Sequence, residues 1–143
     1  MTNQIRVALL DDNGQLDPGA IPDGLAGNGG ARDIAFQFGG DLVVQAGAFY
    51  WLTPSEPIRL LRLSITLGVL GNGGGTVTAA LVVNGSPVGS VSVAGGVRAA
   101  VTHTFTTSEI PAQQVLSVDL TAVPTAGTVK PGNAVVQAEW EYV

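Results

Sequence analysis

Strict alternation of apolar and polar side chains runs through Leu61-Arg62-Leu63-Ser64-Ile65-Thr66-Leu67. Successive side chains of a β-strand point to opposite faces, so a period of two is typical of a half-buried strand. The apolar set is placed on a core, and the polar set faces solvent or a neighbouring protein. Continued on both sides, this stretch predicts a strand over residues 58–69, the best defined of the chain.

The same alternation recurs along most of the chain after residue 34. Residues 76–83 and 88–93 flank Asn84-Gly85, a pair that favours the positive φ angles of a tight hairpin turn. A spacing of about 8 to 12 residues between such strands is typical of a sandwich or barrel. The predicted strands are 34–38, 41–44, 48–52, 58–69, 76–83, 88–93, 97–105, 115–121 and 134–142. Segments 41–44 and 48–52 are alternatively one strand kinked at Gly47, and no stretch supports a helix of three turns.

The strand pattern predicts an all-β fold, an antiparallel β-sandwich or jelly-roll-like domain of about eight strands over residues 34–143. Residues 1–33 differ, because Pro18, Pro22 and a glycine-rich run before residue 31 preclude a helix and most sheet ladders. This segment is predicted to be an extended N-terminal arm whose own core is too small to fold alone, and which docks on another surface. A chain of 143 residues buries roughly 70% of its unfolded surface, so one core is feasible without disulfides.

The charge content is sparse, and it is slightly acidic. Lys and Arg total 6, Asp and Glu total 11, and charged residues make up 12% of the chain, which contains no cysteine. The basic residues are scattered and form no positively charged patch that could bind phosphate groups, so we expect no nucleic-acid partner. So few charges beside 45% apolar residues indicate that partners cover part of the surface. The first residues lack the pattern of a signal peptide, and Arg59 and Arg62 interrupt the longest apolar run, so we expect a soluble product with no membrane partner.

Few side chains are candidates for catalysis. His103 is the single histidine, on the face of Val101 and Phe105, and a packed or interface role is expected because no serine sits in a Gly-x-Ser-x-Gly elbow. Glu139 and Glu141 share a strand face about 7 Å apart, which fits paired-carboxylate glycoside chemistry but arises on any solvated strand. Asp119 is equally ambiguous. We expect no enzyme, no catalytic residue and no cofactor.

Two polar, glycine-bearing segments are candidates for an ion site or a phosphate site. Alternate oxygen ligands from Asp11 to Asp17 are similar to a calcium loop, but the glycine comes two places early and Pro22 stands where the final glutamate belongs. A tight turn is expected there, with a bound cation as the alternative. Residues 71–75 are rich in glycine but precede no helix and no Lys-Ser/Thr pair, so they predict a flexible hairpin tip rather than a phosphate loop. No metal site is expected.

Aromatic side chains occur in two pairs, Tyr50-Trp51 and Trp140 with Tyr142. Together they could form a platform on which a sugar ring stacks, because aromatic faces suit its C–H-rich surface. The alternative is packing in the core or at a subunit interface. These four residues are the candidate contacts to a partner or a glycan.

Several short motifs resemble a β-sandwich domain of tail fibres and other appendage proteins of tailed bacteriophages. The motifs are Phe36-Gln37-Phe38-Gly39-Gly40-Asp41-Leu42, Phe49-Tyr50-Trp51-Leu52, Val82-Val83-Asn84-Gly85-Ser86-Pro87-Val88, Ile110-Pro111-Ala112-Gln113-Gln114-Val115-Leu116 and Lys130-Pro131-Gly132-Asn133-Ala134-Val135-Val136. The segment from Val7 to Leu16, followed by Ile21-Pro22, is similar to linkers that precede fibre head domains. At residue 113 the group often has glycine where this chain has glutamine, which leaves the turn type there open.

The resemblance implies a structural virion protein, and such domains are often homotrimers. A tail fibre or minor tail protein would mediate assembly or contact the host surface. A glycan on that surface would be the ligand of the four candidate aromatic residues. A capsid decoration protein would instead sit on the shell and stabilise it at many identical sites. A carbohydrate-binding module is the alternative from another class. Other virion proteins are the expected partners of residues 1–33.

Overall fold

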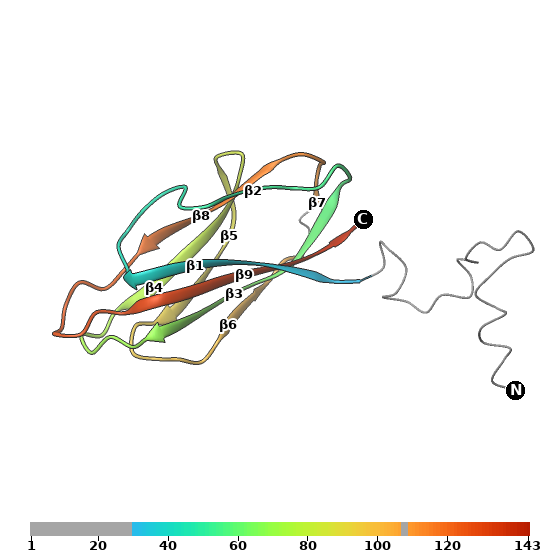
Figure 1. Ribbon diagram of the computed structural model, residues 1–143. Helices are drawn as coiled ribbons and strands as arrows, with labels where there is room; N and C mark the ends of the chain where they lie inside the picture. The colour runs from blue at the N-terminus through green and yellow to red at the C-terminus, as the bar shows by residue number, and fades with distance from the viewer. Residues whose placement is uncertain (1–29, 107–108) are drawn as a thin grey trace, which may run out of the picture.

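The structure, a computed structural model, describes residues 30–106 and 109–143. These residues form nine strands and no helix (Figure 1). The strands are β1 (Arg32–Asp41), β2 (Tyr50–Leu52), β3 (Ile58–Val69), β4 (Thr76–Val83), β5 (Ser86–Ala94), β6 (Val101–Thr104), β7 (Glu109–Ile110), β8 (Val115–Ala122) and β9 (Gly132–Tyr142). In this part of the chain, then, no helix is long and apolar enough to cross a membrane.

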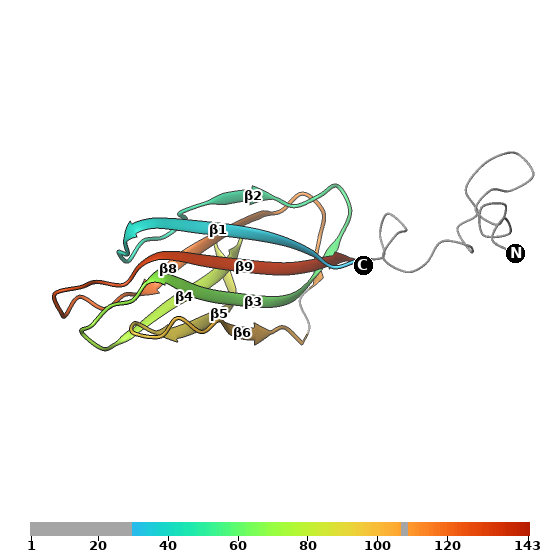
Figure 2. The same ribbon diagram turned by 60° about the horizontal axis from the view of Figure 1, so that its bottom comes forward.

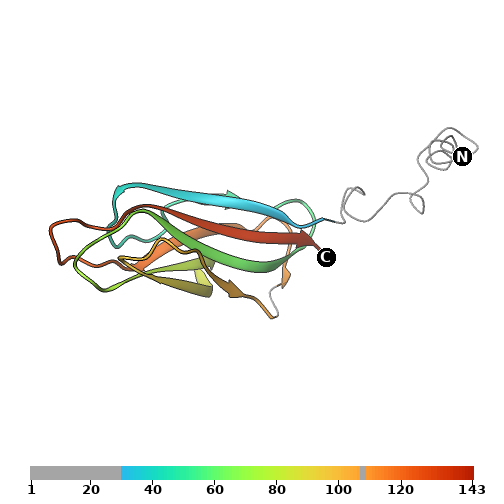
Figure 3. The ribbon, with the colours of Figure 1, turned by 90° about the horizontal axis from the view of Figure 1, so that it is seen from below.

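The strands form two antiparallel sheets that pack face to face (Figures 2 and 3). The five-stranded sheet has the order β1-β9-β3-β6, and β7 pairs with the beginning of β3. The four-stranded sheet has the order β2-β8-β4-β5. Two layers of antiparallel strands around one core are the architecture of a β-sandwich, so the predicted fold class is confirmed.

The core lies between the inner faces of the two sheets. Leu63, Ile65 and Leu67 of β3 are buried, and Val77 and Leu81 of β4 are buried on the opposing sheet. The residues between them are more exposed, as the alternation in the sequence predicts. Leu61, which the alternation placed on the core, is only half-buried, because a β-bulge between Leu60 and Arg62 shifts the register there. The bounds of β3 and β4 match those predicted from the period of two.

The connection through residues 71–75 differs from its prediction as a flexible hairpin tip. It joins β3 to β4, which belong to different sheets, so it crosses between the layers and is not a hairpin. Asn72 ties it to a second loop: its backbone N donates to Val129 O at 3.0 Å, and its Oδ1 accepts from Val129 N at 3.0 Å. A Cβ placed on Gly73 would lie 2.0 Å from Ala126 O, so the two loops pack backbone to backbone.

Two predicted strands are shorter or absent. Residues 42–44 form no strand; Leu42 is buried with its N donating to Pro131 O, and pairing resumes only as a bridge from Gln45 to Leu120. Alternation from residue 97 gives a strand only at Val101–Thr104. Before it, the Arg98 carbonyl accepts from Thr66 Oγ1 at 2.7 Å, and the Arg98 guanidinium donates to Gly68 O at 2.9 Å. Hydrogen bonds with these side chains take the place of ladder bonds there.

Two turns show how local chemistry sets the backbone. Asn84 and Gly85 have φ angles of 48° and 86°, which confirms the tight hairpin turn between β4 and β5. Gln113 has a φ of 61°, so glutamine adopts the left-handed conformation that glycine favours. The corner around it also contains β7, a strand that the sequence did not predict. Its two residues extend the edge of the five-stranded sheet.

The predicted arm and the first strand overlap by two residues. β1 begins at Arg32, whereas the sequence places the start of the domain at residue 34. Residues 1–29 lie outside the described part of the chain. The candidate cation segment from Asp11 to Asp17 therefore lies outside it too.

Candidate functional site

His103 lies on β6 at the side where the two sheets approach each other. Its ring is edge-on to Phe105, with centroids 5.0 Å apart. A Cβ on Gly89 of β5 would lie 2.5 Å from the Phe105 ring and 3.5 Å from the His103 ring. The absence of a side chain at Gly89 therefore lets both rings cover this side of the sandwich.

The carboxylates of β9 face arginines of β3 on the outer surface of the five-stranded sheet. Arg62 donates to both carboxylate oxygens of Glu139, at 2.7 and 3.1 Å, and Arg59 donates to Glu141 at 3.0 Å. The alternation therefore places both glutamates on one face, and each has an arginine as its cross-strand partner. Ion pairs of this kind on an exposed sheet are common surface features.

Asp119 is separate from those pairs. Its Oδ1 accepts a hydrogen bond of 2.6 Å from the backbone N of Gly47, which fixes the turn before β2 against β8. Across residues 30–106 and 109–143, no three His, Asp or Glu side chains come together as a metal site would require.

Three of the four candidate aromatic residues form one cluster. Trp140 lies 5.5 Å from Trp51 and 5.3 Å from Tyr142, measured between ring centroids. Arg32, which the sequence analysis missed, lies over this cluster, with its guanidinium carbon 4.9 Å from the Tyr142 ring centre. Arg32 was assigned to the arm because the alternation of β1 becomes regular only at Ile34.

The cluster is largely internal. Trp140 is only 6% exposed, and within the described residues its buried Nε1 has no hydrogen-bond partner. Trp51 and Tyr142 are half-buried, so the surface that they offer to a ligand is a rim rather than an open platform. Tyr50 lies apart from them, because neighbouring residues of β2 point to opposite faces.

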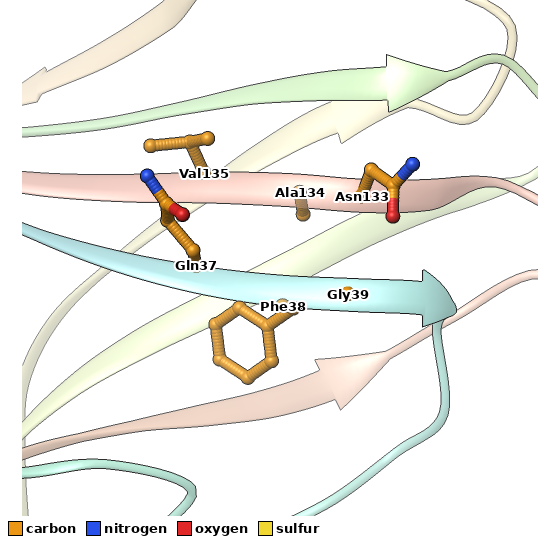
Figure 4. Close-up of a pocket in the computed structure, with 6 residues that line it drawn as sticks. All are labelled: Gln37, Phe38, Gly39, Asn133, Ala134 and Val135. Carbon is orange, nitrogen blue, oxygen red and sulfur yellow. The ribbon is translucent and has the colours of Figure 1, made fainter.

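A shallow hollow lies over β1 and β9 on the five-stranded sheet (Figure 4). It has a volume of about 380 Å³ and is lined by Gln37, Phe38, Gly39, Asn133, Ala134 and Val135. The Asn133 amide is already engaged, because its Oδ1 accepts from Gly40 N at 2.7 Å. The lining contains no charged or titratable side chain, so the hollow offers no acid, base or nucleophilic carboxylate.

The outer face of the four-stranded sheet differs from that of the five-stranded sheet in its lack of charge. Asp119 is the single charged residue of β2, β8, β4 and β5. Four large apolar side chains are exposed on this face: Tyr50 (76%), Leu52 (56%), Val88 (40%) and Val115 (37%). We call this set, with the buried Val82 and Ser117 between its members, the uncharged face.

The strand register brings the uncharged face together. Tyr50 pairs with Ser117, which pairs with Val82 in turn, while Leu52 lies opposite Val115 in the next row. Residues directly opposite in neighbouring strands have Cβ atoms about 5 Å apart, so these side chains form one continuous surface. Alternation in the sequence indicates that each of these side chains points away from the core. It does not indicate that they belong to the same sheet.

No model of a protein family matches this chain, and no curated protein sequence matches it either.

Proposed function

We propose that this chain is a structural component of a tailed-bacteriophage virion, a tail fibre or minor tail protein that mediates assembly or host-surface contact. In this proposal it acts as a homotrimer, and its function lies in protein interfaces. The phage assignment rests on the resemblance of the sequence motifs. The role in assembly rests on the chemistry of the surface.

The uncharged face is the observation that carries the proposal. An isolated soluble domain keeps large exposed apolar side chains scattered, whereas contiguous ones mark surfaces that bind other proteins. Depletion of charge together with exposed aromatic and apolar side chains is also the composition of an interface core. Tyr50 and Leu52 on adjacent rows of one sheet fit this description.

The polar groups of the described residues support the same reading. Glu139 and Glu141 are paired with arginines, and Asp119 holds a turn. These carboxylates have local partners that explain their positions without a substrate. These local partners support a role in protein interfaces over a role in catalysis.

Location on the particle tests the proposal. Gold-labelled antibody raised against the full chain is applied to purified virions whose genome encodes it, and the particles are imaged by electron microscopy. Label on the tail supports the proposal, and label over the head identifies a capsid decoration protein instead. Virions that carry no label, and whose proteins by mass spectrometry lack the chain, would overturn a virion role.

A glycan-binding role is a second candidate, and the cluster of Arg32, Trp51, Trp140 and Tyr142 favours it. Guanidinium and aromatic groups at one rim could contact a sugar from two sides. Retention of the labelled chain on host cells tests it, with Tyr142→Ala as the variant and Gln137→Ala as the surface control. Equal retention of both variants would exclude this rim as the contact.

A further inference from the structure

β1 is the one long and regular edge strand in the described part of the chain (Figure 3). It has 10 residues, it lies at the end of the five-stranded sheet, and its register with β9 is continuous from Arg32 to Phe38. Every second residue of an antiparallel strand directs its N–H and C=O away from the partner strand. Within residues 30–106 and 109–143, residues 33–38 make no backbone hydrogen bond besides those to β9. A row of unpaired backbone groups therefore runs along this edge.

The other sheet edges are protected from the addition of a strand, and β1 is not. β2, β6 and β7 have only 3, 4 and 2 residues. β5 is longer, but it contains Pro87, its register with β4 shifts, and the Phe105 ring lies 2.5 Å from the position of a Cβ on Gly89. Short strands, prolines and bulges are the common means of protecting an edge. β1 contains neither proline nor lysine, and its register shifts only after Phe38.

We infer that the free edge of β1 binds an extended segment of another protein, which joins the five-stranded sheet as a further strand. Unpaired N–H and C=O groups at the spacing of a strand are complementary to a second strand. Main-chain hydrogen bonds then provide the affinity, and alternate side chains provide the specificity. This surface is distinct from the uncharged face, and the inference does not depend on where in a virion the chain is located.

The inner side of the edge determines half of the side chains of the segment. Phe49, in the connection between β1 and β2, lies against Phe36 and Phe38, with ring centroids 6.2 and 5.1 Å away. Phe49 is nevertheless 38% exposed. A strand added beside β1 would direct every second side chain toward this ring. The segment should therefore alternate, with apolar residues on the side of Phe49.

The two ends of the edge determine the charge of the segment. Asp33 and Asp41 are both exposed, whereas Arg32 lies over the Tyr142 ring on the opposite face. A segment with a basic residue near each end would complement the two aspartates. The longest antiparallel pairing of two β1 strands, centred on Gln37, would instead set each Asp33 opposite an Asp41. Like charges directly opposite each other are destabilising, and each chain has a net charge of −5, so charge favours a basic segment over a second copy.

A synthetic peptide of alternating threonine and valine, with a lysine at each end, tests the inference by NMR of the isotope-labelled full chain. Among residues 33–38, the amides that point away from β9 should exchange with solvent at least about tenfold more slowly when the peptide is bound. A peptide with proline at its two central positions should not slow the exchange, because proline has no N–H to donate. Equal slowing by both peptides, or by neither, would overturn the inference. Slowing that grows with the concentration of the chain alone would also overturn it, because a second copy would then occupy the edge.

Reversal of one charge tests the chemistry of the segment. Asp33→Lys should weaken binding of the lysine-ended peptide about threefold and should strengthen binding of a glutamate-ended peptide by a similar factor. Glu109→Lys is the matched control, because it makes the same change of charge on β7, which pairs with β3 and not with β1. Circular dichroism checks that both variants are folded. An Asp33→Lys chain with the peptide preference of the wild type would contradict the choice of a basic segment.

The virion proposal and the addition of a strand fail in different ways. A chain that is found on the phage tail but binds neither peptide removes the strand partner and leaves the virion role standing. A chain that binds the lysine-ended peptide through β1 but is absent from virions does the reverse.

Discussion

The two sheets of the sandwich have equivalent inner faces and contrasting outer faces. Inside, both contribute fully buried aliphatic side chains, such as Leu63 on one sheet and Leu81 on the other. Outside, the five-stranded sheet carries cross-strand ion pairs, and the four-stranded sheet carries Tyr50 and Leu52. Burial of a core dictates the inner faces in any sandwich, but it leaves the outer faces free, so their difference points to function.

Substitutions on the inner faces should cause the largest losses of stability, and the loss should be similar for the two sheets. Leu63→Ala and Leu81→Ala each remove a fully buried side chain, so each should lower the free energy of unfolding by about 2–5 kcal/mol. Urea denaturation measures both. A loss from one variant below about 1 kcal/mol would show that the two sheets do not share one core.

A substitution in the loop of residues 71–75, which joins the two sheets, should cause the next largest loss of stability. Gly73→Ala forces a Cβ onto the Ala126 carbonyl, so it should cost about 1–3 kcal/mol of stability. Gly39→Ala is the matched control, because a Cβ there meets nothing within 4 Å. Thermal unfolding of both variants checks the prediction, and equal midpoints would show that the two loops do not pack as described.

A substitution at Gln113 should increase the stability of the fold slightly. Gln113→Gly relieves a left-handed backbone, so it should stabilise the fold by about 0.5–1 kcal/mol despite the greater freedom of glycine in the unfolded chain. Gln137→Gly, in the middle of β9, should destabilise the fold by a similar amount. If both changes destabilise in urea titrations, the left-handed backbone at residue 113 is not strained.

The smallest effect should be that of the outer ion pairs. A double-mutant cycle of Arg62→Ala and Glu139→Ala should give a coupling energy of about 0.2–1 kcal/mol, because the pair is exposed. The coupling should fall further in high salt. A value above about 2 kcal/mol, insensitive to salt, would place this face in an interface and remove its contrast with the uncharged face.

The sequence predicts the inner faces well and the assembly of the sheets poorly. The period of two gives the bounds of β3 and β4, because alternation is a local consequence of burial on one side, but it does not predict the β-bulge that removes Leu61 from the core. It does not specify which sheet a strand joins, so the loop at residues 71–75 was predicted to be a hairpin. Residues 97–100 alternate as a strand does, but the hydrogen bonds from Thr66 and Arg98 exclude them from the ladder.

For the candidate contact residues, too, the sequence predicts local features but not how the strands are assembled. The sequence grouped Tyr50 with Trp51 because they are adjacent, although alternation along β2 already separates them to opposite faces. The approach of Trp51 to Trp140 joins two sheets, and the position of Arg32 depends on where β1 begins. Neither is encoded in local pattern, and the uncharged face emerges only when β2, β8 and β4 are placed side by side.

The mass of the full chain in solution shows whether the chain assembles with itself. Sedimentation equilibrium of the wild type at low and high salt should give three times the 14.5 kDa of one chain, with no weakening in high salt because the uncharged face supplies the contact. Leu52→Lys measured in parallel should shift toward the mass of one chain. A wild-type mass of one chain at every concentration and both salt levels would contradict the account.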